Sequence, residues 1–352
     1  MHSAALDRLG WSQWFEDRFS SHRGEGLEPG RISADFGVAF TVSIAGGDRV
    51  GRATGKLRHD GAGPNDRPVV GDWVVFEPGS GDSGSIHAIL ERRTAFSRKV
   101  AGETTQEQVM AANIDRVFVV SALSEDLNLA KLERYLTIGW ESGALPVVLL
   151  TKADLSPDLD AVRVRVEAIA PGATVLVTSS ITGQGMDLVR GELGPGITAV
   201  LVGPSGVGKS TLINQLTGGD LATGALRRDG KGRHTTTHRQ LIPIDSGGMI
   251  IDTPGIRELQ LWHGEEGLDQ TFDDIALLAL GCRFTDCDHE SEPGCAVQAA
   301  IAAGTLPAER LASYRKLGRE IRAMRRKEDK RLQIEDKNRW KAITKANRTR
   351  LK

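Results

Sequence analysis

The sequence predicts a protein of several domains, in which a central α/β domain follows a small β-barrel and precedes a helical module. At 352 residues the chain exceeds the roughly 250 residues at which single hydrophobic cores usually stop growing. Short β-type runs separated by turn residues occupy residues 34–97, whereas strand and helix patterns alternate over residues 98–258. The last 43 residues are rich in Arg and Lys and poor in Gly and Pro, which is typical of polar helices.

Residues 1–33 are predicted to form an N-terminal extension. Leu6–Phe15 is an amphipathic stretch that we expect to dock as a helix, and Ser20–Gly30 has the composition of a loop. Met1–Phe15 lacks an apolar core of the signal-peptide type, and no run of about 18 apolar residues occurs. With 39% hydrophobic and 26% charged residues, the composition is that of a packed soluble protein. We therefore expect a cytosolic protein without a membrane partner.

The β-barrel is predicted over residues 34–97. Turns containing Gly, Pro, Asn and Asp separate its strands, and no helical period lies between them. A five-stranded Greek-key barrel of this size is typical of the OB-fold, which often binds oligonucleotides. The β-type runs are Val38–Ile44, Gly51–Leu57, Val69–Phe76 and Ser85–Leu90.

Near-continuous apolar runs identify the α/β domain, which is predicted over residues 98–258. Such runs are typical of parallel strands that are buried on both faces of a sheet. The runs are Ile114–Val120, Pro146–Leu150, Thr174–Thr178, Thr198–Val202 and Met249–Ile251.

A phosphate-binding loop is predicted at Gly203–Ser210, which matches G-x-x-x-x-G-K-[ST] between an apolar strand and a helical pattern. The glycines allow backbone N–H groups to approach phosphate oxygens, Lys209 can reach the outer phosphates and Ser210 can ligate Mg²⁺. A plain glycine turn is the alternative. The residues predicted to bind the phosphates are Gly203, Pro204, Ser205, Gly206, Val207, Gly208, Lys209, Ser210 and Thr211.

A guanine-binding element is predicted in the run from Thr151 to Asp154, which follows a strand at the carboxyl edge of the sheet. Asp154 can accept hydrogen bonds from the N1–H and the N2 amine of guanine, a pair of donors that adenine lacks. Lys152 can lay its methylene stem on the base or ribose, and the 178–180 turn can offer backbone donors to guanine O6. A helix-capping Asp and an ordinary polar turn are the alternatives. The predicted contacts are Thr151, Lys152, Ala153, Asp154, Ser179 and Ser180.

The run from Asp252 to Gly255, again directly after an apolar strand, predicts the γ-phosphate side of the site. Asp252 would hold Mg²⁺ through water, and the Gly255 N–H would contact the γ-phosphate. In familiar GTPases the phosphate loop comes first and the guanine-binding motif fourth. Here the guanine-binding residues precede the phosphate loop, so we expect a circularly permuted GTPase domain.

Hydrolysis requires a residue that orients water, and the position that usually carries Gln after the Asp252 motif is Ile256. His234 is the predicted replacement, because an imidazole can orient or deprotonate a water molecule. The alternative is that His234 only contacts RNA or solvent. Thr236 resembles the switch threonine that ligates Mg²⁺, although Thr235 and Thr237 compete for this role.

A metal-binding module is predicted over residues 259–309. Three thiols and one imidazole within fourteen residues have the composition of a closed tetrahedral Cys₃His zinc site, which favours a structural role. Incidental clustering of reduced cysteines is the alternative. The predicted ligands are Cys282, Cys287, His289 and Cys295.

The tail, residues 310–352, carries seventeen Lys and Arg against five Asp and Glu, whereas the other 309 residues carry 28 basic and 41 acidic side chains. A charge of +12 beside an acidic body favours contact with a phosphate backbone over a merely solvated helical face. Such binding weakens steeply with salt.

Together with the permuted order, the Gly232–Thr237 run, the barrel and the Cys/His cluster resemble the ribosome small-subunit-dependent GTPase A family over nearly the whole chain. The resemblance implies GTP hydrolysis stimulated by the small ribosomal subunit, a role in its late maturation and contact with its rRNA. It also points to His234 in hydrolysis and to the Cys₃His cluster as the zinc site.

The sequence therefore predicts a monomeric GTPase that uses Mg²⁺ with GTP, carries one structural zinc ion, binds the small ribosomal subunit and its rRNA, and leaves on hydrolysis to GDP. Two other functions stay open at this point. One is an RNA-binding assembly scaffold with a structural nucleotide. The other is a phosphate-loop ATPase or kinase, which Asp154 disfavours.

Overall fold

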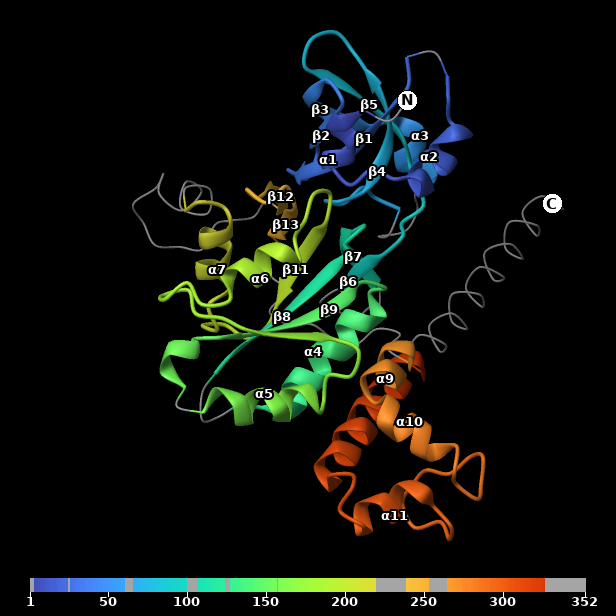
Figure 1. Cartoon of the computed structure of the whole chain (residues 1–352). Helices are drawn as coiled ribbons and strands as arrows, with labels where there is room; N and C mark the ends of the chain where they lie inside the picture. The colour runs from blue at the N-terminus through green and yellow to red at the C-terminus, as the bar shows by residue number, and fades with distance from the viewer. Residues whose placement is uncertain are drawn as a thin grey trace, which may run out of the picture.

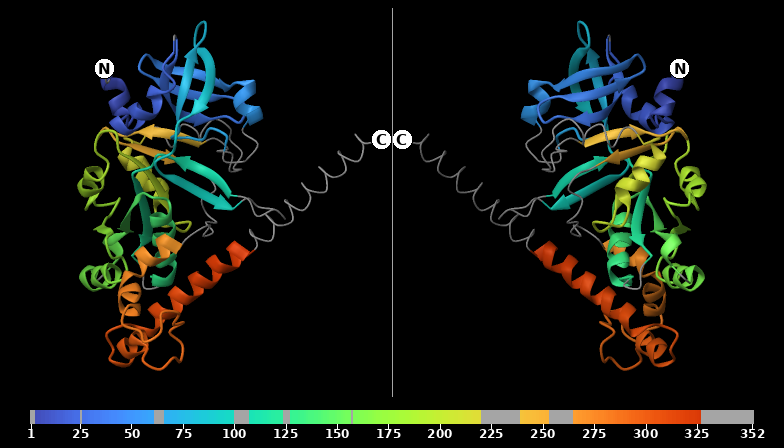
Figure 2. Two further views of the ribbon diagram at one scale, coloured as in Figure 1. Left: turned by 90° about the vertical axis from the view of Figure 1, so that its right-hand side faces the viewer. Right: turned by 90° about the vertical axis from the view of Figure 1, so that its left-hand side faces the viewer.

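The structure is a computed structural model of the whole chain (Figure 1). It describes residues 3–24, 26–60, 66–99, 107–123, 127–156, 158–219, 239–252 and 265–326. The barrel and the metal-binding module lie at opposite ends of the central α/β domain (Figures 1 and 2). Within the described ranges no helix has both the length and the apolar composition needed to cross a membrane.

The barrel closes in the strand order β1-β2-β3-β5-β4, because β4 also pairs with β1. The β3–β5 pairing is parallel and the other pairings are antiparallel, with α3 between β3 and β4. This arrangement confirms the predicted OB-fold-like barrel. The expectation that no helix lies between its strands was wrong, because residues 55–60 are helical and the predicted Gly51–Leu57 run ends as a strand at Ala53. Its elements are β1 (Glu28–Asp35), β2 (Phe40–Ile44), β3 (Gly47–Ala53), α3 (Gly55–Asp60), β4 (Trp73–Pro78) and β5 (Ser83–Ile89).

The expectation of a loop over Ser20–Gly30 was wrong at its end, because β1 already begins at Glu28. Pro29 and Gly30 disfavour a strand in sequence terms. The structure uses Gly30 for a close approach between strands: a Cβ there would lie 2.4 Å from a side-chain carbon of Val42 on β2. The residue that weakens the strand pattern is thus the one that allows the barrel to close tightly.

The amphipathic N-terminal stretch forms two helices, α1 (Ala4–Arg8) and α2 (Gln13–Ser20), where one helix was expected. Gly10, with φ of +85°, lies in the turn between them. Aromatic side chains from this region pack against Trp73 of the barrel, with ring centroids 4.6 Å away for Trp11 and 5.7 Å away for Phe15. Docking against the barrel therefore buries their apolar faces.

The α/β domain has a parallel sheet in the order β10-β9-β8-β11-β13, and all five predicted runs form its strands. Alternate strand residues face α4 and α5 on one side and α6 and α7 on the other, which explains why the runs are apolar throughout. The elements are β8 (Arg116–Ala122), α4 (Leu129–Glu141), β9 (Leu145–Thr151), α5 (Leu159–Glu167), β10 (Thr174–Val177), α6 (Met186–Gly191), β11 (Thr198–Val202), α7 (Lys209–Leu216) and β13 (Met249–Asp252).

Three further strands were not predicted. β12 (Arg239–Pro243) pairs antiparallel with β13 and also with the end of β1, so the sheet of the α/β domain continues into the barrel. β6 (Ala95–Lys99) and β7 (Glu107–Ala112) form a separate antiparallel hairpin between the barrel and β8.

The C-terminal module begins with α9 (Glu265–Thr271) and α10 (Asp273–Ala279), continues with α11 (Ala296–Ala302) and is followed by helical residues 308–326. α9 packs on α4 of the α/β domain. A Cβ at Gly267 of α9 would lie 2.3 Å from the carbonyl oxygen of Thr137 on α4, so the two helices need a glycine at this contact.

Candidate functional site

The phosphate loop curls around the side chain of Lys209. Its Nζ donates to the carbonyl oxygens of Gly203 and Pro204, at 2.6 and 2.5 Å. Gly203 has a φ of +143°, and a Cβ there would lie 2.2 Å from the carbonyl oxygen of Val120 on β8. Only glycine fits this position, and α7 then begins at Lys209. The predicted run Gly203–Thr211 is therefore a strand-loop-helix element suited to phosphates.

Thr151 joins the guanine-binding element to the phosphate loop. Its buried hydroxyl donates to the carbonyl oxygen of Val207 at 2.6 Å. β9 and β11 lie on either side of β8 with parallel register, so their carboxyl ends meet at one edge of the sheet. The structure thus brings together two segments whose order in the chain is reversed relative to familiar GTPases.

Asp154 is held by the turn that follows β10. Ser179, which is fully buried, donates from its hydroxyl to Asp154 Oδ1 at 2.5 Å and accepts from the N–H groups of Ile181 and Thr182, both at 3.2 Å. Lys152 adopts a left-handed conformation with φ of +61°, and Ala153 and Asp154 lie in a short 3-10 helix. Only backbone donors were predicted for this turn, so the contact made by the side chain of Ser179 was not predicted.

A second unpredicted contact comes from α7. The side-chain amide of Gln215 donates to the carbonyl oxygen of Ser180, next to the residue that holds Asp154. No motif includes Gln215, because its position in the last turn of α7 matters only once the helix packs beside the 178–180 turn.

Asp252 lies at the end of β13, next to β11 and its phosphate loop. Burial raises the pKa of its carboxyl group above the usual value. A carboxylate in such surroundings is stabilised by a cation, and Asp252 and Ser210 offer the oxygen ligands that Mg²⁺ prefers. The remaining predicted residues of this side, His234, Thr236 and Gly255, lie outside the described residues.

The predicted metal ligands gather in one cluster whose four ligand atoms lie within 4.8 Å of one another. The Nδ1 atom of His289 lies 3.5 Å from the sulfur atoms of both Cys282 and Cys295, and these sulfurs are 3.8 Å apart. Tetrahedral zinc with bonds of about 2.3 Å to sulfur places two sulfurs about 3.8 Å apart. Cys287 completes a donor set that can bind a metal ion.

The pKa values of the clustered side chains also favour a bound cation. Burial lowers the pKa of His289, which favours the neutral imidazole that binds metals. Desolvation, and then the neighbouring thiols, raise the pKa of Cys287 to about 11. Closely packed thiols therefore resist ionisation together unless a positive ion compensates. The carbonyl oxygen of His289 accepts from Gln298 and Arg315, which fixes the backbone at a residue with φ of +58°.

Known proteins resemble this chain in both sequence and fold. A sequence model described as RsgA GTPase matches residues 89–262. The chain is 43% identical to the small ribosomal subunit biogenesis GTPase RsgA of Opitutus terrae, over 98% of this chain and 97% of that protein. This chain belongs to the RsgA GTPase family. The RsgA of Streptomyces coelicolor is 46% identical, over 96% of this chain and 92% of its own.

Two solved structures resemble this RsgA-family chain. YjeQ from Thermotoga maritima has a TM-score of 0.64 at 27% identity, covering 84% of this chain and 98% of its own. YloQ, described as a circularly permuted GTPase, has a TM-score of 0.63 at 25% identity, covering 86% and 97%. The predicted α/β fold with a circularly permuted GTPase domain, and the predicted hydrolase activity on GTP, are thereby confirmed.

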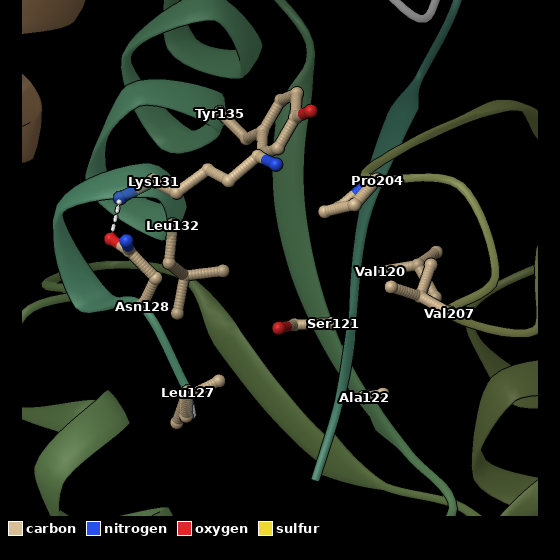
Figure 3. A pocket seen from close by; sticks show the side chains of 10 residues that line it. All are labelled: Val120, Ser121, Ala122, Leu127, Asn128, Lys131, Leu132, Tyr135, Pro204 and Val207. Atoms are coloured by element: carbon tan, nitrogen blue, oxygen red, sulfur yellow. Dashed lines mark hydrogen bonds between the residues drawn. The ribbon is translucent and has the colours of Figure 1, made fainter. Parts of the chain in front are cut away.

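A pocket of about 240 Å³ lies beside the phosphate loop of this RsgA-family protein (Figure 3). In the close-up, Lys131 and Tyr135 extend from α4 toward Pro204. The residues that line the pocket come from the end of β8, the start of α4 and the phosphate loop: Val120, Ser121, Ala122, Leu127, Asn128, Lys131, Leu132, Tyr135, Pro204 and Val207.

Proposed function

We propose that this chain binds the small ribosomal subunit, hydrolyses GTP there during late maturation of the subunit and leaves on hydrolysis. The relatives from Opitutus terrae and Streptomyces coelicolor are named as small ribosomal subunit biogenesis GTPases. The observation that carries the proposal is the bond from Thr151 to Val207, because it brings the predicted guanine-binding element into contact with the predicted phosphate loop.

In the proposed site Asp154 and Lys152 bind guanine, and the N–H of Ser180 reaches O6. The Gly203–Thr211 segment surrounds the phosphates. Mg²⁺ would supply charge neutralisation at the outer phosphates. Ser210, Asp252 and Thr236 are its proposed ligands, since the raised pKa of Asp252 marks a carboxylate in need of a cation. The Gly255 N–H contacts the γ-phosphate.

His234 is the proposed water-orienting residue, because Ile256 has no hydrogen-bonding group. We expect slow intrinsic hydrolysis that rises when the small subunit positions His234 next to the attacking water. His234→Ala should abolish most of the stimulation and leave GTP affinity unchanged. Stimulated hydrolysis that persists in this variant would remove His234 from the mechanism.

The OB-fold-like barrel and the basic tail are the proposed rRNA contacts. In the described part of the tail, Lys316, Arg319 and Arg326 are exposed cations, and a positive surface of this kind binds phosphate backbones. The metal of the Cys₃His cluster is proposed to be zinc with a structural role, which elemental analysis of the purified protein would test. We further propose a cytoplasmic monomer with the domain limits given above, except that the barrel begins at Glu28 with β1.

The deciding experiment measures GTP turnover with and without purified small subunits over a range of salt concentrations. We expect stimulation that declines steeply as salt rises. Binding of the subunit without any effect on turnover would favour an assembly scaffold with a structural nucleotide. Equal competition by ATP and GTP at equal concentration would favour a phosphate-loop ATPase or kinase.

A further inference from the structure

We infer that Gln215 is a positioning residue for guanine recognition, which it serves by fixing the turn that faces O6 of the base. This inference rests on the proposed contact between the Ser180 N–H and guanine. Gln215 itself does not touch the nucleotide in this arrangement. Its amide instead connects the helix behind the phosphate loop to the turn beside Asp154.

The Ser180 backbone is held from both sides. On one side the buried hydroxyl of Ser179 is bonded to Asp154 and to the N–H groups of Ile181 and Thr182. On the other side the Ser180 carbonyl accepts from Gln215. The Ile181 N–H and the Ser180 carbonyl belong to one peptide group, which is thus held at both ends. The preceding peptide group, which carries the Ser180 N–H, is held through the Ser179 carbonyl, which accepts from the Gly183 N–H at 2.9 Å. Two fixed neighbouring peptide groups leave little freedom to the Ser180 dihedral angles, so the direction of its N–H is set in advance.

The Ser180 N–H is also available for a ligand. Among the described residues it donates to no backbone or side-chain acceptor, whereas the N–H groups of Ser179, Ile181 and Thr182 are all satisfied. Ser180 is only partly buried. A donor that is oriented, accessible and unused within the protein is what recognition of a carbonyl oxygen requires.

Gln215 also sets the spacing between the two halves of the ligand site. It lies in the last turn of the helix that Lys209 begins, about 9 Å further along the axis. Arg190 of α6 donates to its backbone carbonyl at 3.3 Å, which anchors this end of α7. The phosphates bind at one end of α7 and the other end holds the base-facing turn, so the helix acts as a spacer between them.

The test compares GDP with 6-thio-GDP, which differs only in a weaker hydrogen-bond acceptor at position 6. Gln215→Met keeps the length of the side chain and removes the donor, whereas Gln215→Glu places an oxygen against the Ser180 carbonyl. Gln184→Met is the matched control, because Gln184 is exposed in the same loop. Equilibrium affinities for both nucleotides and for inorganic tripolyphosphate are measured on the full chain, with far-UV circular dichroism to verify folding.

Both Gln215 variants should bind GDP roughly fivefold more weakly, as expected for one lost hydrogen bond. They should also lose most of the preference for GDP over 6-thio-GDP and keep tripolyphosphate affinity within about twofold. A fall by the same factor for GDP and 6-thio-GDP would overturn the inference, because it would indicate a general structural role.

Nucleotide binding by the unmodified protein distinguishes a failure of this inference from a failure of the proposed contact between Ser180 and guanine on which it rests. If the unmodified protein does not prefer GDP over 6-thio-GDP, the proposed contact of Ser180 with O6 is wrong. If that preference exists and both Gln215 variants retain it, only the role of Gln215 is wrong.

Discussion

Asp154 owes its orientation to Ser179, whose hydroxyl donates to Oδ1 and leaves Oδ2 for the proposed contact with the base. Because of this arrangement, Asp154→Asn should change which base the protein prefers. The amide oxygen of Asn would keep the bond from Ser179, so its NH₂ group would face the base. A donor there repels the N1–H and N2 amine of guanine but pairs with the C2 carbonyl of xanthine.

We therefore expect Asp154→Asn to weaken GDP binding at least about 100-fold, since two hydrogen bonds to a charged group are lost. Binding of xanthosine diphosphate should rise over that of the unmodified protein. Calorimetric titration with both nucleotides measures these two changes in affinity. Equal losses for both would mean that Asp154 does not contact the base.

The sequence was sufficient to predict the loop before α7 at Gly203–Ser210 and the cluster of four candidate metal ligands, because both are marked by spacing along the chain. It did not reveal Gln215 or the side-chain role of Ser179. Both act through contacts across the fold, and a Gln in a helix or a Ser in a turn has no distinguishing local pattern.

A buried ion-pair network fastens the C-terminal module to the α/β domain. Arg310, whose side chain is 4% exposed, donates to Glu133 of α4 at 2.9 Å and to Asp274 of α10 at 2.5 and 2.9 Å. Burial raises the pKa of Glu133, whereas Arg310 lowers it. The network thus joins the module to the helix that follows β8.

Arg310→Met should reduce the free energy of unfolding by about 3 kcal/mol at neutral pH, because Glu133 would stay buried without its cationic partner and would keep only its hydrogen bond with Ser313. The pKa of Glu133 would rise further. A carboxyl group with a raised pKa in the folded state favours folding when protonated, and this benefit disappears as pH rises through that pKa. The loss should therefore be larger at pH 8 than at pH 5.

Urea unfolding at both pH values measures this difference. Arg319→Met is the control, since Arg319 is exposed on the same helix. A loss that does not depend on pH would show that Arg310 contributes through packing on Phe272, whose ring centroid lies 4.7 Å from its guanidinium, and not through the charge of Glu133.

The parallel strands were predictable as elements because each is apolar on both faces, whereas the link between the domains was not. β12 is a short strand between β13 and β1, and its pairing of Gln240 with Ala34 depends on a strand about 200 residues earlier in the chain. A strand that pairs with a strand of another domain is stabilised by residues far away in the sequence, so its own residues need not show a complete strand pattern.

Arg31 strengthens the same link from inside. Its side chain is almost fully buried and donates to the carbonyl oxygens of Leu9, Gly71 and Asn113, which belong to the N-terminal helices, the barrel and the start of the α/β domain. Burial lowers its pKa to about 10, so it remains charged at neutral pH. One cation thereby satisfies acceptors from three parts of the molecule.

Arg31→Met should therefore uncouple the barrel from the α/β domain rather than unfold one of them alone. Removing the cation takes this donor from the carbonyls of Leu9 and Asn113, at a cost of roughly 2 to 4 kcal/mol. The carbonyl of Gly71 still accepts from the side-chain amide of Asn113. We expect a calorimetric transition at lower temperature that broadens or splits, because the two domains no longer unfold together. Arg52→Met, at an exposed position of the same barrel, should unfold like the unmodified protein. A single sharp transition, merely shifted, would mean that the β1–β12 pairing alone couples the domains.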